Sequence, residues 1–233
     1  MRSQKIAALL FCLALLTAFL CGCSKTVTTA DSTTSPAAVT NGKEKPTEAQ
    51  DEKEETKKEN NGTEDSDMEH TQVKFTMENG KEFIIELYPE YAPDTAKNFK
   101  KLVSEGFYDG LTFHRVSPGF MAQGGDPEGT GFGGAKETIK GEFRANGFSQ
   151  NTLSHQRGVV SMARSGNPNS ASSQFFICYG DESFLDGNYA AFGKVIEGME
   201  TVDDFAKVEL VYNSGGEKSS PAEPIVIKNA VVL

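Results

Sequence analysis

The chain has 233 residues, of which 37% are hydrophobic, and its 23 basic and 33 acidic side chains give a formal net charge of -10. This charge argues against nucleic acid as a partner, because neutralising phosphates requires a basic surface. The modest hydrophobic fraction excludes a protein that crosses a membrane many times, and the length allows one large domain or two small ones. The composition is uneven, however, and it divides the chain into three segments.

The first segment, residues 1–22, has the pattern of a bacterial lipoprotein signal peptide. A positively charged start precedes fifteen residues, Ile6 to Leu20, with a single polar member. Spanning a bilayer takes about 20 apolar residues, whereas a charged start and a shorter apolar run are typical of a secretory signal. The run ends in Leu20-Cys21-Gly22-Cys23, which resembles the lipobox Leu-x-Gly-Cys. We therefore expect Cys23 to carry lipid and to anchor the chain on the extracytoplasmic face of a bacterial membrane. An ordinary cleaved signal is the alternative.

The second segment, residues 23–70, is expected to be the lipidated Cys followed by a disordered acidic tether. Residues 24–70 contain no Leu, Ile, Phe, Tyr or Trp, and their 12 acidic and 6 basic side chains give a net charge of -6. Such a segment cannot offset the entropy lost on ordering. As a flexible coil it would extend about 35–40 Å, which is enough to hold a domain away from a lipid surface. A spacer without a further role is the alternative.

The third segment, residues 71–233, has the length and composition of one folded domain, because it holds all six Tyr and 14 of the 16 Phe. Residues 73–77 and 83–87 flank Asn79-Gly80, which predicts a β-hairpin. Pro93 opens a helix with an apolar face, and Gly106 ends it.

Short apolar runs predict the remaining elements of this domain. We expect strands over 112–116, 120–123, 159–163, 174–178, 190–196 and 225–233, and a second helix over 199–205. Many short strands, frequent glycine turns and only two helices predict a mainly β fold. Its expected form is a closed antiparallel barrel whose open ends the two helices cover.

Several familiar kinds of chemistry find no support in the sequence. The three His residues have no Cys or carboxylate at metal-ligand spacing, so we expect no metal site. No Gly-x-Ser-x-Gly motif occurs, which argues against a serine hydrolase. Residues 129–134 match Gly-x-Gly-x-x-Gly, but no apolar strand precedes them, and this favours a surface loop over a dinucleotide site. Cys178 lies in an apolar run, where a small buried side chain is the better interpretation than a nucleophile.

The most informative cluster runs from Phe113 to Asp126. If its first residues form a strand, Phe113 and Arg115 share one face and His114 lies on the other. Arg115, with the apolar residues and glutamine of Phe120-Met121-Ala122-Gln123 soon after it, then places a fixed cation beside an apolar surface, where its charge needs compensation. An ordinary Arg on the outside of a barrel is the alternative.

This cluster closely resembles the cyclophilin signature. The similarity continues, in order and at family-like spacings, through residues 161–163, 172–177, 184–187 and 191–195, and it covers nearly all of residues 71–233. The resemblance implies an eight-stranded barrel with two capping helices. It also implies peptidyl-prolyl cis–trans isomerase activity that needs no cofactor and no metal.

Carried over by position, the resemblance makes Arg115 the catalytic residue. The substrate-binding residues that it implies are the proline pocket Phe120, Met121, Phe176 and Leu185, the hydrogen-bonding Gln123 and Gln174, the backbone around Ala163 and Arg164, and the rim residues Phe184 and Tyr189. This chain departs from the common pattern at three of them. Phe184 replaces the Trp of many eukaryotic members, Tyr189 replaces a common His, and Arg164 replaces a common Asn. The loop 166–172 also has one extra residue.

The expected function is therefore a prolyl isomerase that assists folding of exported proteins at the outer face of the membrane. Its expected partners are proline-containing segments of those proteins and the membrane, through the lipid anchor. We expect a monomer and no contact with nucleic acid. Two alternatives remain open: a barrel that binds proline-containing segments without turning them over, and a general chaperone that acts independently of proline.

Overall fold

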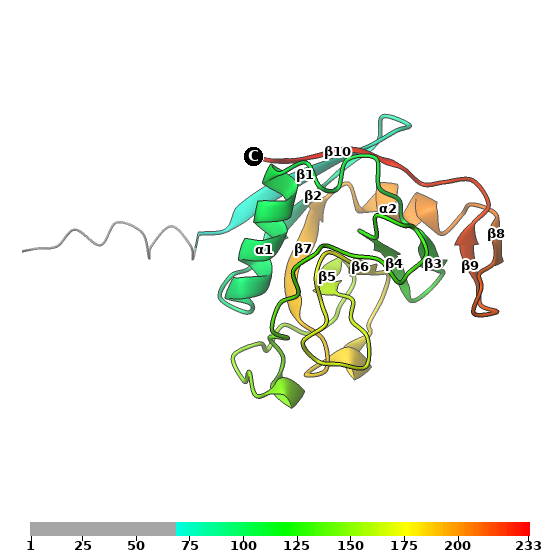
Figure 1. The fold of residues 1–233 in the computed structure, drawn as a ribbon. Coiled ribbons are helices and arrows are strands. Elements are labelled where there is room, and N and C mark those ends of the chain that lie inside the picture. Colours follow the sequence, from blue (N-terminus) through cyan, green and yellow to red (C-terminus); the bar gives the residue numbers. More distant parts are fainter. Residues whose placement is uncertain (1–68) are drawn as a thin grey trace, which may run out of the picture. The chain divides into compact units, whose positions relative to one another are not determined.

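The computed structural model describes residues 69–233 (Figure 1). The predicted signal peptide, the lipidation site Cys23 and the tether lie outside these residues. In chain order the elements are β1 (Thr71–Met77), β2 (Glu82–Leu87), α1 (Pro93–Ser104), β3 (Arg115–Ser117), β4 (Met121–Gly124), η1 (Arg144–Asn146), β5 (Val159–Met162), β6 (Phe175–Cys178), η2 (Ser183–Leu185), β7 (Ala191–Glu197), α2 (Met199–Phe205), β8 (Leu210–Tyr212), β9 (Lys218–Pro221) and β10 (Ile227–Val232).

Eight strands form one antiparallel sheet in the order β10-β1-β2-β7-β5-β6-β4-β3, and β8 and β9 form a separate hairpin. The prediction of a closed barrel is wrong, because the end strands β3 and β10 do not form a ladder with each other. The chain before β3 meets the residue before β10 at an isolated bridge between Thr112 and Val226, and β3 itself begins only at Arg115. The sheet is therefore an open half-barrel.

The interior of the half-barrel is filled by aromatic side chains. Phe175 is completely buried, and its ring lies within 6 Å of the rings of Phe75, Phe99, Tyr108 and Phe113. Both helices were predicted from the sequence, and each contributes an apolar face to this core. The core fixes the curvature of the sheet and hence the position of every strand that carries a candidate site residue.

Helix α1 receives its N-terminal cap from a distant residue. The carboxylate of Glu142 accepts hydrogen bonds from the backbone N–H groups of Asp94 and Thr95, at 3.0 and 2.8 Å, and from the Thr95 hydroxyl at 2.7 Å. A carboxylate at this end of a helix accepts from N–H groups that lack partners within the helix, and its negative charge interacts favourably with the helix dipole. At the other end Gly106 adopts a positive φ of 68°, as the sequence predicted for a helix end.

The β8–β9 hairpin was not predicted from the sequence. Its strands have only three and four residues, which is too short for an alternation of apolar and polar residues to be recognised. Asn213 closes the turn, because its side-chain oxygen accepts hydrogen bonds from the backbone N–H groups of Gly215 and Glu217 at 2.9 and 3.0 Å. The hairpin packs beside β3, which is the strand that begins with Arg115.

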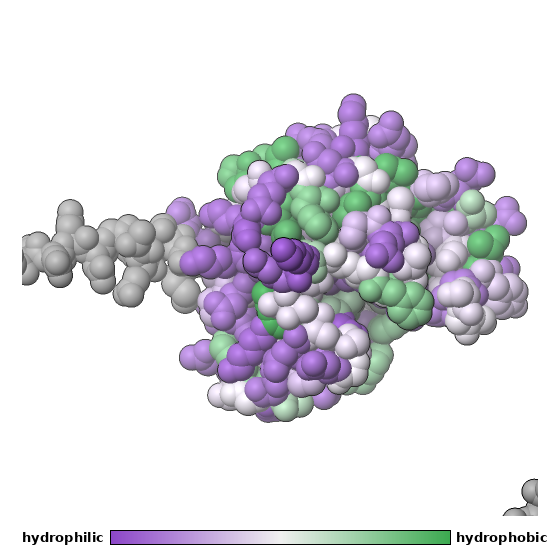
Figure 2. Space-filling model, in the orientation of Figure 1, coloured by the Kyte–Doolittle hydropathy of each residue, from purple (hydrophilic) through white to green (hydrophobic). Residues whose placement is uncertain are grey.

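On the face of the domain seen in Figure 2, hydrophilic side chains predominate and the hydrophobic ones form small separate areas. Within the described residues no helix is long and apolar enough to cross a membrane.

Candidate active site

Strands β3 and β4 place two polar side chains next to each other on the outside of the half-barrel. Arg115 pairs with Gln123 and Val116 pairs with Ala122 in the antiparallel register. Directly opposed residues share a face of the sheet. Val116 and Ala122 are both completely buried in the core, so Arg115 and Gln123 face outward together.

The shared face of Phe113 and Arg115 was predicted on the condition that residues 113–116 form one strand, and that condition is wrong. The ring of Phe113 is completely buried in the aromatic core. The alternation of strand β3 begins only at Arg115 and does not extend back to Phe113.

The guanidinium of Arg115 is held in a fixed plane by two side chains. Its Nε and Nη2 atoms donate to the two carboxylate oxygens of Glu217 at 2.8 and 2.9 Å. Its Nη1 atom donates to Oε1 of Gln123 at 3.3 Å and lies 3.8 Å from Sδ of Met121. Donation from Arg115 lowers the pKa of Glu217, so this carboxylate is ionised at neutral pH. These oxygens engage three of the five N–H donors of a guanidinium, which leaves donors for a ligand.

The hydrogen bond to Arg115 sets the orientation of a chain of amides. Oε1 of Gln123 accepts from Arg115, so Nε2 of Gln123 is left to donate to Oε1 of Gln174 at 2.8 Å. Nε2 of Gln174 in turn donates to the backbone carbonyl of Gly133 at 2.7 Å. Each amide has a defined direction, which a lone glutamine on a surface would not have.

A cavity of about 270 Å³ with an apolar floor and a partly polar rim opens beside this cation. It is lined by Arg115, Phe120, Met121, Gln123, Ala163, Arg164, Phe176, Leu185 and Tyr189. Its floor is the buried cluster of Met121, Phe176, Cys178 and Leu185. A small apolar ring that enters the cavity would therefore lie against hydrocarbon, with the guanidinium at its edge.

The structure brings nine of the eleven predicted site residues to this cavity, and it places the other two close by. Gln174 lines a neighbouring cavity of about 280 Å³. Its side chain accepts a hydrogen bond from Gln123, which lines both cavities. Phe184 is 69% exposed, and its ring stacks on that of Phe120 with centroids 5.8 Å apart. The cavity is thus made from β3, β4, β6 and the loops around them, and the roles of its residues stay predictions.

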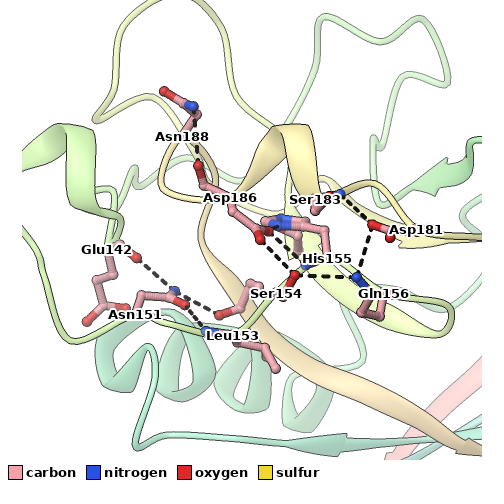
Figure 3. A network of polar contacts seen from close by, with 12 residues as sticks. Glu142, Asn151, Leu153, Ser154, His155, Gln156, Asp181, Ser183, Asp186 and Asn188 are labelled. Carbon is pink, nitrogen blue, oxygen red and sulfur yellow. Dashed lines mark hydrogen bonds and ion pairs between the residues drawn. The ribbon is translucent and has the colours of Figure 1, made fainter.

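The loop that carries Phe184, Leu185 and Tyr189 is held from below by a buried histidine (Figure 3). Nδ1 of His155 contacts the Asp186 carboxylate at 2.8 Å, and its Nε2 contacts the Ser161 hydroxyl at 3.0 Å. The His155 ring also stacks on Phe176, with centroids 6.0 Å apart.

Three hydrogen bonds reach the Asp186 carboxylate from consecutive residues: from the Ser154 hydroxyl at 2.7 Å, and from the backbone N–H and the ring of His155, both at 2.8 Å. This network connects Phe176 on the floor of the cavity to the loop that carries Leu185 and Tyr189.

His114 does not lie on the opposite side from Arg115, and that prediction is also wrong. It lines a third cavity, of about 210 Å³, together with Arg115, Gln123 and Glu217. Both of its ring nitrogens are buried and have no hydrogen-bond partner within residues 69–233. Burial lowers the pKa of His114, and the nearby charge of Asp126 offsets this only in part, so the ring is neutral at pH 7.

Cys178 is buried, which confirms its interpretation as a small core side chain. It is completely inaccessible to solvent, and burial raises the pKa of its thiol to about 12. Within residues 69–233 no group of three His, Cys, Asp or Glu residues could hold a metal ion.

Two features of the site were missed from the sequence: the partner of Arg115 and the support of the pocket floor. Glu217 lies 102 residues after Arg115, and Asp186 lies 31 residues after His155. No local pattern marks either pair. The Gly215-Gly216 turn was the one available signal, because it permits the hairpin that presents Glu217.

Burial of His155 makes the stability of the fold depend on pH in a predictable way. Burial lowers the pKa of His155, and contact with Asp186 offsets this only in part. As the pH falls below about 7, the unfolded chain therefore takes up a proton before the folded chain does, and the free energy of unfolding decreases. Urea unfolding at several pH values measures this. We expect His155→Gln to flatten the decrease between about pH 7 and 5. An unchanged slope would contradict the assignment.

Comparison with known proteins identifies the family. The family model described as cyclophilin type peptidyl-prolyl cis-trans isomerase matches residues 72–232. Peptidyl-prolyl cis-trans isomerase B of Bacillus subtilis is 50% identical over 137 residues, which are 59% of this chain and 92% of that protein. Peptidyl-prolyl cis-trans isomerase ppi1 of Schizosaccharomyces pombe is 41% identical over 150 residues, which are 64% of this chain and 92% of that protein.

A solved structure agrees with these sequence matches. The crystal structure of a cyclophilin type peptidyl-prolyl cis-trans isomerase from Cryptosporidium parvum is 32% identical to this chain, with a TM-score of 0.59 over 71% of this chain and 98% of that one. The match of the family model, together with these relatives, shows that the chain belongs to the cyclophilin-type peptidyl-prolyl cis–trans isomerases.

Proposed function

We propose that this enzyme isomerises X–Pro bonds of exported proteins at the cavity beside Arg115, with Arg115 as the catalytic residue. One observation carries the proposal: a guanidinium in a fixed plane stands at the edge of a cavity of about 270 Å³ whose floor is apolar. The apolar floor suits a proline ring. The free N–H donors of Arg115 suit an atom that gains electron density only during the reaction.

The chemistry of the X–Pro bond explains why this arrangement suffices. Rotation is slow because amide resonance opposes it, with a barrier of about 20 kcal/mol. When the bond is twisted by 90° the resonance is lost, and the proline nitrogen becomes pyramidal and regains its lone pair. A donor directed at that nitrogen has no partner in the planar ground state. Arg115 therefore stabilises the transition state more than the substrate, which raises the rate.

The apolar surroundings contribute in a second way. The planar amide is charge-separated, so water stabilises it more than it stabilises the twisted form. A cavity floor of Met121, Phe176 and Leu185 removes that water from one side of the bond. The reaction forms and breaks no covalent bond, so the mechanism needs no nucleophile, proton transfer, metal or cofactor.

The setting that we propose for this reaction is the outer face of a bacterial membrane. It rests on the sequence of residues 1–23, with a lipobox-like Leu20-Cys21-Gly22-Cys23, and on the acidic segment that follows. Newly exported chains fold in that compartment, so their proline-containing segments are the proposed substrates. The lipid on Cys23 would keep the enzyme beside the membrane that these chains cross.

Substitution of Arg115 tests the catalytic assignment. We expect the parent chain to accelerate isomerisation of a short peptide with one proline, and Arg115→Ala to lose activity by a factor on the order of 10², as when one fixed donor is removed elsewhere. Circular dichroism and the urea midpoint check that the variant is folded. A folded parent without acceleration would leave a peptide-binding module, and activity retained in Arg115→Ala would favour a chaperone that acts without this residue.

Substitution of Glu217 tests whether the ion pair positions Arg115. We expect Glu217→Ala to lower kcat by about tenfold with little change in KM, because the guanidinium loses its alignment but the cavity is unchanged. In an Arg115→Ala background the same change should have no further effect. Glu223→Ala, which removes an exposed carboxylate just beyond β9, is the control. Additive losses in the double variant would show that Glu217 acts through the fold instead.

Labelling with a fatty-acid analogue in a bacterial host tests the anchor. We expect the parent chain to incorporate the label and to sediment with membranes, and Cys23→Ala to do neither. Cys21→Ala, at the variable position of the lipobox-like sequence, should keep both properties. An unlabelled parent chain, or labelling that survives Cys23→Ala, would rule out lipidation at this position.

A further inference from the structure

Arg164 stands between two cavities. It lines the cavity beside Arg115 and also the neighbouring cavity of about 280 Å³. Gln123 and Ala163 are the other residues that line both. A peptide whose proline occupies the first cavity would therefore place a nearby side chain in the second, next to Arg164.

The guanidinium of Arg164 is held in place without an acidic partner. It lies over the rings of Tyr189 and Phe143, with its central carbon 4.7 and 5.0 Å from their centroids. Its Nε and Nη2 atoms donate to the backbone carbonyl of Asn188 at 3.1 and 2.9 Å, and Nη1 donates to the carbonyl of Ser165 at 2.9 Å. None of the salt bridges within residues 69–233 includes this residue.

These contacts make Arg164 rigid but leave its charge uncompensated. Aromatic faces and carbonyl dipoles orient a guanidinium without cancelling its full positive charge. Asn188 belongs to the loop that the Asp186 network holds (Figure 3), so the platform beneath Arg164 is itself fixed. A cation that is already ordered loses less side-chain entropy when it binds an anion.

The two cavities are cationic although the chain is strongly acidic. None of the residues that line them is Asp or Glu, and their charged residues are Arg115 and Arg164. Glu217 already neutralises Arg115. Of the two arginines that line these cavities, Arg164 therefore keeps its positive charge uncompensated, although the net charge of the chain is -10.

We infer that Arg164 makes this enzyme select proline segments that carry an Asp or Glu side chain close to the proline, with that carboxylate in the second cavity. The inference rests on the proposed function, because it requires the proline to occupy the first cavity. A carboxylate there would meet N–H donors that carbonyls do not use, in a charge-assisted hydrogen bond. The hydroxyl of Ser172, which also lines this cavity, can donate to the second carboxylate oxygen.

A purely structural role is the competing explanation. Arg164 would then serve to tie Asn188 to the end of β5, and its loss would affect every substrate equally. The two explanations differ in whether the effect depends on the charge of the substrate.

A peptide series separates these explanations. Each peptide has one proline, and Glu, Gln or Lys occupies in turn each of the two positions before and the two positions after it. We expect the full chain, at low salt, to show kcat/KM for Glu about threefold to tenfold above Gln at one position, with Lys below Gln. Salt near 0.5 M should reduce the ratio of Glu to Lys, because the cation is partly exposed.

Variants of Arg164 then assign the preference. Arg164→Gln should bring the ratio of Glu to Lys close to one, and Arg164→Glu should invert it. An inversion cannot arise from damage to the fold, which would lower all the rates together. Lys194→Gln removes an exposed positive charge on β7 that lines neither cavity, and it should leave the ratio unchanged.

The outcomes distinguish this inference from the function on which it rests. If the enzyme isomerises no peptide of the series faster than the uncatalysed rate, the proposed function fails. If the neutral peptides are isomerised but no position favours Glu, the inference is overturned and the proposed function stands. A preference for Glu that survives both Arg164 variants also overturns it.

Discussion

The ion pair between Arg115 and Glu217 is the constraint on which the site depends. Arg115 lies on a strand of three residues and is partly exposed, so nothing in its own strand would fix a long side chain. The carboxylate fixes it, because two parallel hydrogen bonds define the plane of the guanidinium as well as its position. The β8–β9 hairpin, which adds nothing to the main sheet, supplies that carboxylate. Through Glu217, the hairpin therefore orients Arg115.

A second constraint acts on the apolar side of the cavity. The ring of Phe176 lies between the cavity and His155, and the carboxylate of Asp186 joins that histidine to the loop bearing Leu185 and Tyr189. Cation and pocket are thus supported by separate groups of residues, one polar and outside the sheet, the other buried beneath it. Gln123 belongs to the polar group, because it accepts from Arg115, and it also lines the cavity.

Local signals predicted much of the fold, and distant contacts account for what they missed. Asn79-Gly80 and Pro93 identified the first hairpin and the start of α1, because a tight turn and a helix start each depend on adjacent residues. The sequence cluster around Arg115 identified the cavity residues through its resemblance to a family. Glu217 could not be found this way, since its place beside Arg115 arises only when the hairpin packs on β3. The closed barrel was wrong because the length of β3, which sequence periodicity leaves undefined, decides whether the sheet edges pair.

We propose that Arg115 acts on the twisted bond and contributes little to holding the ground state. Exchange NMR of a proline peptide at equilibrium tests it most directly, because it gives the rate of cis–trans exchange on the enzyme and the affinity in one sample. The comparison is between the parent chain and Arg115→Lys, which keeps the charge but loses the planar set of donors. We expect Arg115→Lys to bind the peptide with similar affinity and to catalyse much slower exchange. Equal losses of affinity and exchange would contradict it, as would exchange at the parent rate.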